Sequence, residues 1–341
     1  MTTSASGTNL SNGPRYLVTG ALGCIGAWTV VNLARKGIPV VAFDLGSDPR
    51  RVRQLATPEE FAAVTFAQGD ITSLESVERA LDDHAITHVI HLAALQVPFC
   101  RADPPLGARV NVVGTVNVFE AVSRRSGRIG SVTYAGSLGM FSAADADPES
   151  GRLEADAVAH PVNHYGVYKQ ANEATARIYR RDNGVASVGL RPMTVFGMGR
   201  DQGITSGPTK AILAAVLGRP YEIGFGGRTL FNYASDVAEA LVLASCRSVG
   251  EAVAFNLNGT HAGVGDFVAA LEAVVPGSAG LISVAEAALP FPEIISDAGL
   301  ETIGDVPITP LASAIDATVD LFRSRLRDGR LAPQEYGLAA S

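Results

Sequence analysis

The chain is poor in cysteine and has no long apolar run. Its three cysteines, Cys24, Cys100 and Cys246, stand far apart in the 341 residues. Their number is odd and none has the spacing of zinc ligands, so the sequence predicts neither a disulfide framework nor a metal site and favours a reducing compartment. No stretch reaches the roughly 18 consecutive apolar residues of a membrane span. We therefore expect a cytoplasmic protein with no membrane partner.

Basic charge is also scarce. The formal net charge is -7, and the basic runs near Arg50 and Arg124 are short. Nucleic acid requires a clustered basic face, so it is not an expected partner. Residues 1–13 are rich in Ser, Thr, Gly and Asn and lack the basic start and apolar core of a signal peptide. We expect them to form a disordered leader.

The first half of the chain alternates short apolar runs with helical patterns. Strands are expected at 16–19, 40–43, 64–67, 88–92, 130–134 and 186–190. Strands that alternate with helices of this length predict parallel β-α-β units, and their continuous apolar character predicts a sheet buried on both faces. We therefore predict an α/β fold whose doubly wound parallel sheet, of the Rossmann type, occupies residues 14–191.

The alternation loosens in the second half. Residues 197–232 carry many Gly, Arg and Pro and are expected to be loops that frame a pocket. A strand at 253–257 and helices near 236–245, 265–274 and 312–327 complete a smaller C-terminal region. We expect residues 192–341 to form mainly a substrate-binding region that caps the carboxyl ends of the strands, with some segments returning to the Rossmann core.

A glycine-rich turn joins the first expected strand to the first helix. Gly20, Gly23 and Gly26 have GxxGxxG spacing. The first permits a tight turn, the second lets the backbone approach a pyrophosphate, and the third lets the helix pack closely on the sheet. The start of the helix then offers unpaired amides to the phosphates. This context favours a dinucleotide site over a purely structural strand-turn-helix.

An acidic residue at the end of the second strand indicates which dinucleotide is bound. Asp44 can accept hydrogen bonds from both ribose hydroxyls and would repel a 2′-phosphate, which favours NAD over NADP. Arg50 and Arg51 follow closely and would soften that preference.

Tyr165 and Lys169 lie four residues apart on an expected helix, so both side chains leave the same face. A phenol is a poor base near neutral pH, and a neighbouring ammonium stabilises its phenolate form. Ser137 follows the strand that ends at Tyr134 and would hydrogen-bond the same substrate hydroxyl. Taken alone, the Tyr–Lys spacing also fits an amphipathic helix with an extended lysine.

These motifs together resemble the extended short-chain dehydrogenase/reductase family, of the NAD-dependent epimerase/dehydratase type. The resemblance runs from about residue 15 to residue 244. It rests on TGALGCIG (19–26), Asp44, GDI (69–71), HLAA (91–94), Asn111, YAGS (134–137), YGVYK (165–169), LRP (190–192) and SDVAEAL (235–241).

The resemblance implies NAD as cofactor and a catalytic trio of Ser137, Tyr165 and Lys169. The cofactor contacts it implies, besides Tyr165 and Lys169, are Gly20, Leu22, Gly23, Cys24, Ile25, Gly26, Asp44, Asp70, Ile71, Leu92, Ala93, Ala94, Asn111, Pro192, Thr194 and Val195. A hydrogen bond to local backbone is an equally good role for Asn111. The resemblance also implies a homodimer formed through the helices at 107–125 and 164–182.

Two departures from the family pattern bear on the substrate. Members that dehydrate nucleotide sugars carry an Asp-Glu pair where this chain has Leu138 and Gly139, so dehydration is disfavoured. Many enzymes of UDP-sugars carry Asn where this chain has Thr194, which cannot offer the same amide donor and acceptor. We therefore expect a smaller sugar, sugar acid or polyol as the substrate. Its expected contacts are Ser137, Arg200, Asp201, Gln202, Thr205, Ser206 and Arg228, although solvated loop residues are an equal alternative for the last six.

Three functions remain open at this point. The leading hypothesis is an NAD-dependent oxidoreductase that moves a hydride between NAD and a secondary alcohol of a carbohydrate-like substrate, with Tyr165 as acid and base. The alternative is a sugar or nucleotide-sugar epimerase, which needs the same residues and oxidises its substrate only transiently. A non-catalytic NAD-binding scaffold is less expected because it has no need for Ser137, Tyr165 and Lys169 together.

Overall fold

The computed structural model describes residues 13–247 and 250–338, and its centre is a parallel sheet of seven strands in the order β11-β7-β5-β4-β1-β2-β3. The strands are β1 (Tyr16–Thr19), β2 (Val40–Asp44), β3 (Val64–Gln68), β4 (His88–His91), β5 (Ser131–Ala135), β7 (Ala186–Arg191) and β11 (Ala252–Asn256). Each neighbouring pair is parallel. The predicted doubly wound sheet is confirmed.

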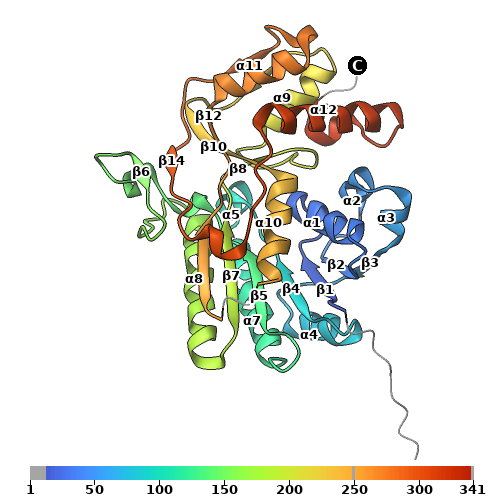
Figure 1. The fold of residues 1–341 in the computed structure, drawn as a ribbon, viewed down its shortest axis with the longest axis vertical. Coiled ribbons are helices and arrows are strands. Elements are labelled where there is room, and N and C mark those ends of the chain that lie inside the picture. Colours follow the sequence, from blue (N-terminus) through green and yellow to red (C-terminus); the bar gives the residue numbers. More distant parts are fainter. Residues whose placement is uncertain (1–12, 248–249, 339–341) are drawn as a thin grey trace, which may run out of the picture.

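Helices cover both faces of this sheet (Figure 1). On one face lie α1 (Cys24–Arg35) and α10 (Ala234–Ser245); on the other lie α4 (Leu74–Asp83), α7 (Gly114–Ser123) and α8 (His164–Asn183). Alternate strand residues enter two separate cores: Leu17 packs with the second helix group and Val18 with the first. Burial on both faces explains why these strands are continuously apolar.

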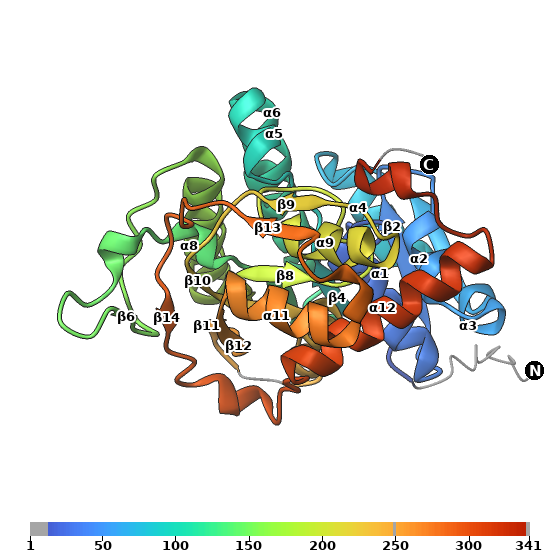
Figure 2. The ribbon, with the colours of Figure 1, turned by 90° about the horizontal axis from the view of Figure 1, so that it is seen from above.

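A smaller region stands at one end of the sheet (Figures 1 and 2). Its three-stranded sheet has the order β12-β10-β8, from Thr260–Gly263, Arg228–Tyr233 and Thr194–Phe196. The helices around it are α9 (Gly207–Val216), α11 (Val264–Val274) and α12 (Leu311–Arg327). Two short strand pairs, β9 (Tyr221–Ile223) with β13 (Ile282–Val284) and β6 (Arg152–Leu153) with β14 (Ile294–Ile295), complete it.

The expectation that residues 197–232 are loops is wrong for much of that range. Helix α9 and strands β9 and β10 lie within it. Eight of the ten residues of α9 are buried, and its first turn contains Pro208, which is favourable at a helix start although it reads as a loop signal in the sequence.

Two elements from the second half of the chain, one strand and one helix, lie with the seven-stranded sheet. Strand β11 forms an edge of the sheet and pairs with β7, and helix α10 packs against α1 on one face. The helix expected at 107–125 is also interrupted, because a π-helical turn at Arg109–Val113 separates α6 (Pro104–Ala108) from α7. Residues 1–12 of the expected leader lie outside the described residues. No helix among the described residues is both long and apolar enough to span a bilayer.

Candidate active site

A cavity of about 800 Å³ opens where the strands of the large sheet end. Its walls come from the loops that follow those strands and from the loop after β8. The lining falls within residues 20–26, 43–51, 69–71, 92–99, 135–139 and 192–205, together with Val110, Tyr165, Lys169 and Phe291. This is the position at which open α/β sheets bind their ligands.

The glycine turn forms the floor of one end of the cavity. Gly20 has a φ of +67°, and a Cβ there would overlap the backbone of Ala93. A Cβ on Gly26 would overlap the carbonyl oxygen of Gly20. The turn therefore accepts no side chain at either position, and it brings the start of α1 and its amide groups to the cavity wall. These residues fit a bound dinucleotide pyrophosphate.

Asp44 is the last residue of β2 and faces the same end of the cavity. Its Oδ2 accepts a hydrogen bond from the Leu22 amide at 2.9 Å, and its Oδ1 accepts one from the Gly46 amide at 3.0 Å. A carboxylate oxygen can accept a second hydrogen bond. The side chain is thus fixed in place while keeping acceptor capacity for a ribose.

Tyr165 and Lys169 lie in the first turns of α8, which begins after Asn163. The Asn163 side chain caps the helix by accepting a hydrogen bond from the Gly166 amide at 2.9 Å. Lys169 is 5% exposed, and its ammonium donates to the Ala135 carbonyl at 2.7 Å and lies 5.6 Å from the centre of the Tyr165 ring. The lysine is therefore held between the helix and the end of β5.

Ser137 and Tyr165 both lie next to Gly139. The Ser137 Oγ accepts a hydrogen bond from the Gly139 amide at 3.0 Å. A Cβ on Gly139 would lie 3.1 Å from that Oγ and 3.6 Å from Cε1 of Tyr165. Ser137, Tyr165 and Lys169 all line the cavity, so a substrate oxygen placed near Gly139 would be within reach of the serine and the phenol.

A buried histidine supports the loop behind this group. His91 contacts the Thr19 hydroxyl through Nδ1 at 2.7 Å and the Thr115 hydroxyl through Nε2 at 3.0 Å. Burial, with a smaller contribution from the charge of Lys169, lowers the pKa of His91 to about 3. The Thr19 hydroxyl also accepts hydrogen bonds from the amides of Leu92 and Ala93. His91 is therefore a neutral structural residue at neutral pH.

A buried ion pair ties α8 to the sheet. The Arg191 guanidinium donates to both carboxylate oxygens of Glu173, at 2.7 and 2.6 Å, and to Asn256 at 3.1 Å. Glu173 follows Lys169 by one helical turn, and Arg191 directly precedes Pro192 on the cavity wall. The pair thus links the helix that carries the tyrosine to β7 and β11.

Most of the residues that the sequence singled out meet at this cavity. Those on its wall are Gly20, Leu22, Gly23, Cys24, Ile25, Gly26, Asp44, Asp70, Ile71, Leu92, Ala93, Ala94, Ser137, Tyr165, Lys169, Pro192, Val195, Arg200, Asp201, Gln202 and Thr205. Cys24 is half-buried on the wall, and desolvation raises the pKa of its thiol to about 11, so the thiol stays protonated at neutral pH.

Two residues predicted as cofactor contacts lie off the wall, and for Asn111 the structure shows the alternative role, a hydrogen bond to backbone. Asn111 uses its amide on the backbone of Leu95, accepting at 2.7 Å and donating at 2.9 Å. Thr194 is fully buried, and its hydroxyl pairs with that of Thr229 at 2.7 Å. Asn111 therefore supports the wall from behind, and Thr194 is a packing residue.

Two residues expected to contact the substrate also lie off the wall. Arg228 is exposed at the start of β10. Ser206 is buried next to α9, and its hydroxyl donates to the Gly203 carbonyl at 2.8 Å. The serine therefore shapes the loop that precedes α9, behind the residues that face the cavity.

Other wall residues were missed by sequence reasoning. The cavity lining also includes Gln96, Phe99, Met193, Ile204 and Phe291. Gln96 and Met193 follow recognisable motifs within a few residues, so their position could have been inferred. Phe291 belongs to a segment without any recognisable motif, and it reaches the cavity only through the tertiary fold.

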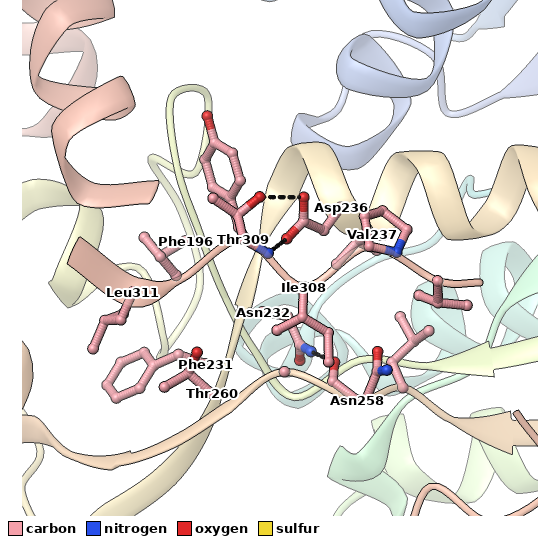
Figure 3. Close-up of a pocket in the computed structure, with 15 residues that line it drawn as sticks. Phe196, Phe231, Asn232, Asp236, Val237, Asn258, Thr260, Ile308, Thr309 and Leu311 are labelled. Carbon is pink, nitrogen blue, oxygen red and sulfur yellow. Dashed lines mark hydrogen bonds between the residues drawn. The ribbon is translucent and has the colours of Figure 1, made fainter. Parts of the chain in front are cut away.

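A second, small cavity lies between α10 and residues 306–311 (Figure 3). Its volume is about 10 Å³, room for no more than one water molecule. Asp236 accepts hydrogen bonds there from the amide and the hydroxyl of Thr309, at 2.7 and 2.8 Å. Burial raises the pKa of Asp236 despite these bonds. The cavity is too small for a substrate, and Asp236 acts as an anchor for the segment before α12.

The fold and the glycine turn define a dinucleotide-binding enzyme of the Rossmann type, and comparison with known proteins identifies its family. The model of the NAD dependent epimerase/dehydratase family matches residues 16–257, and the chain belongs to this family. It is an NAD-dependent enzyme.

Individual relatives agree with this assignment. The chain is 31% identical over 281 residues to a UDP-glucose 4-epimerase of Azospirillum brasilense, covering 76% of this chain and 77% of that protein. It is 29% identical to UDP-glucuronate 4-epimerase 4 of Arabidopsis thaliana, of which the match spans 44%. The UDP-glucose 4-epimerase of Thermus thermophilus, solved as a complex with NAD, superposes with a TM-score of 0.75 at 25% identity, covering 91% of this chain and 99% of that one.

Proposed function

We propose that this chain uses NAD to oxidise a secondary alcohol of a carbohydrate-like substrate, with Tyr165 as acid and base. The observation that carries the proposal is the meeting of Tyr165, Lys169 and Ser137 on the wall of the cavity that begins at the glycine turn. A chain that only binds NAD has no need for this arrangement.

Each of the three side chains has a distinct role in the proposal. Tyr165 takes the proton from the substrate hydroxyl and returns it in the reverse direction. Ser137 hydrogen-bonds the same oxygen and steadies the charge that develops on it. Lys169 stabilises the phenolate form of Tyr165 through its positive charge. Bound NAD supplies the hydride acceptor.

The charged groups on the wall and the buried residue at position 194 bear on the choice of substrate. Arg50 and Arg51 are both paired with Asp201, whereas Arg200 donates to the neutral hydroxyl of Thr205, at 3.0 Å. Buried Thr194 offers no amide to a uracil or a sugar. Because position 194 lacks that amide, we favour a sugar acid, free sugar or polyol over a nucleotide sugar, and Arg200 would pair with the carboxylate of a sugar acid.

An epimerase is the second candidate, supported by the relatives named above, which are 4-epimerases of UDP-sugars. It requires the same Tyr165 chemistry, and the hydride then returns to the opposite face of the ketone intermediate. The two functions differ in outcome, because only the dehydrogenase accumulates NADH.

Absorbance at 340 nm, recorded with NAD and a panel of free sugars, sugar acids, polyols and UDP-sugars, tests the proposal. Accumulating NADH supports the dehydrogenase. A new epimer seen by NMR without NADH supports the epimerase. A substrate that Tyr165→Phe turns over as fast as the unaltered enzyme would contradict both.

We also propose a homodimer formed through α7 and α8. These helices pack against each other, and the apolar side chains of Val113, Val167 and Ile178 on or next to them are 46–47% exposed. Light scattering on the protein as it elutes from a size-exclusion column should give twice the chain mass of 35.4 kDa. A monomer at micromolar concentration would contradict the dimer.

A further inference from the structure

Two arginines near the adenosine end of the cavity are held by an acidic residue from the opposite side. Arg50 and Arg51 begin α2 (Arg50–Leu55), and Asp201 lies in the loop between β8 and α9. The Arg51 Nη2 donates to both oxygens of Asp201, at 2.8 and 2.7 Å, and the Arg50 Nη2 donates to Asp201 at 3.0 Å. All three residues line the cavity, and the Asp201 side chain is only 5% exposed.

The arginine pair lies close to the carboxylate expected to bind the ribose. Asp44 accepts from the amide of Leu22, and the Nη1 of Arg51 donates to the carbonyl of the same residue at 2.8 Å. The two charged groups therefore flank one residue of the glycine turn. A phosphate on the ribose 2′-oxygen would enter the space beside Asp44, within the reach of a flexible arginine.

The arginines have little binding capacity left. Besides Asp201, Arg50 pairs with Glu335 at 2.9 Å, and Gln54 donates to the same Glu335 oxygen. The two positive charges therefore face the carboxylates of Asp201 and Glu335 in a partly desolvated cluster, with the exposed Asp48 a third carboxylate 3.6 Å from Arg50. Arginine recognises phosphate through accessible donors and net positive charge. This cluster has no net positive charge, and the Arg51 Nε, which has no partner, is buried.

We propose that Asp201 makes the site selective for NAD over NADP by occupying and neutralising Arg50 and Arg51. Asp44 repels a 2′-phosphate directly, and Asp201 removes the cations that would otherwise offset that repulsion. This inference depends on the proposed placement of the dinucleotide along the glycine turn. A residue on the substrate side of the cavity would then help to set which dinucleotide binds.

A structural role for Asp201 is the competing explanation. The same loop is anchored by Trp28, whose indole donates to the Met198 carbonyl at 2.9 Å, and by the Gly199 amide, which donates to the Tyr336 hydroxyl at 2.7 Å. If Asp201 only holds the loop, its loss weakens NAD and NADP binding alike. The ratio of the two dissociation constants separates the explanations.

Binding to the unaltered enzyme gives the first test, by calorimetry or by the fluorescence of Trp28, the one tryptophan of the chain. We expect 2′,5′-ADP to bind no more tightly than 5′-AMP, because the arginines are occupied. If 2′,5′-ADP binds ten times more tightly, the proposal is overturned without any variant.

The second test is Asp201→Asn, which keeps the shape and removes the charge. We expect the ratio of the NADP and NAD dissociation constants to fall at least tenfold, and the added Arg51→Gln to restore it to within threefold of the unaltered value. Asp48→Asn is the matched control, because the exposed Asp48 lies 3.6 Å from Arg50, and it should change the ratio less than threefold. A ratio unchanged in Asp201→Asn, with NAD still bound, overturns the inference. Failure of the unaltered enzyme to bind NAD would instead overturn the proposed function.

Discussion

The Lys169 ammonium lies 5.6 Å from the centre of the Tyr165 ring and donates a hydrogen bond to the Ala135 carbonyl. One helical turn brings the two side chains to the same face of α8, and the end of β5 fixes the direction of the lysine. The distance between charge and phenol therefore depends on how the helix docks on the sheet, as well as on sequence spacing.

Lys169→Met should impair both catalysis and cofactor binding. The change removes the ammonium that lies 5.6 Å from the centre of the Tyr165 ring and a hydrogen-bond donor on the cavity wall. We expect kcat to fall by about 10²- to 10⁴-fold, the usual contribution of acid–base groups, with a higher dissociation constant for NAD. Steady-state rates and calorimetry provide the two values. An unchanged NAD affinity would show that the lysine does not reach the cofactor.

Gly26→Ala should block the dinucleotide site, because the new Cβ overlaps the Gly20 carbonyl oxygen. Overpacking of this kind costs about 1–3 kcal/mol, so NAD should bind at least about fivefold more weakly. Gly265→Ala is the control: it lies in α11, where a Cβ meets no atom within 4 Å, and alanine is the better helix former. If Gly26→Ala binds NAD within twofold of the unaltered enzyme, the glycine turn is not part of the cofactor site.

The stability of the fold should decline in acid because of His91. Its pKa is lowered from 6.5 to about 3 by burial and by the charge of Lys169, so below pH 6.5 the unfolded chain binds a proton that the folded chain does not. The contribution is complete above pH 6.5 and is lost progressively as the pH falls toward 3. About 2 kcal/mol should be lost by pH 5.

Urea unfolding at pH 7 and pH 5 measures this effect. His91→Gln should reduce the difference in unfolding free energy between the two pH values, whereas the exposed His164→Gln should leave it unchanged. A pH dependence as steep in His91→Gln as in the unaltered protein would show that another group causes it.

Glu173→Ala should be strongly destabilising, because it leaves Arg191 buried without a counter-charge. Both side chains are less than a tenth exposed, and breaking such a pair typically costs about 3–5 kcal/mol. The control is Glu251→Ala, which removes the partner of Arg180 at 3.4 Å on the surface and should cost less than about 1 kcal/mol. Equal losses for the two variants would contradict the structural role given to the Glu173–Arg191 pair.

The fold and the cofactor half of the site follow closely from sequence patterns. Strand–turn–helix order around Gly20, the acidic end of β2 at Asp44 and the Tyr165–Lys169 spacing are local features, set within a few residues of one another. Parallel strands then bring their carboxyl ends to one edge of the sheet. This explains why nearly all the predicted cofactor contacts line one cavity.

The substrate half was harder to predict because it depends on long-range packing. Phe291 reaches the wall from a segment more than 100 residues after the end of α8. Thr194 is turned away by its pairing with Thr229, and Asp201 is occupied by arginines from α2. None of these partners is near in sequence, so a local pattern contains no sign of them.

The exchange of Tyr165 for phenylalanine shows whether this phenol acts as the acid and base. The matched control is Tyr168→Phe, since that phenol donates to the Pro104 carbonyl at 2.8 Å, one turn along the same helix. The measurement is single-turnover hydride transfer with any substrate that reduces bound NAD. We expect Tyr165→Phe to slow this step by about 10²- to 10⁴-fold while its affinity for NAD is unchanged. Tyr168→Phe should react at the rate of the unaltered enzyme. Equal rates in Tyr165→Phe and the unaltered enzyme would contradict the account.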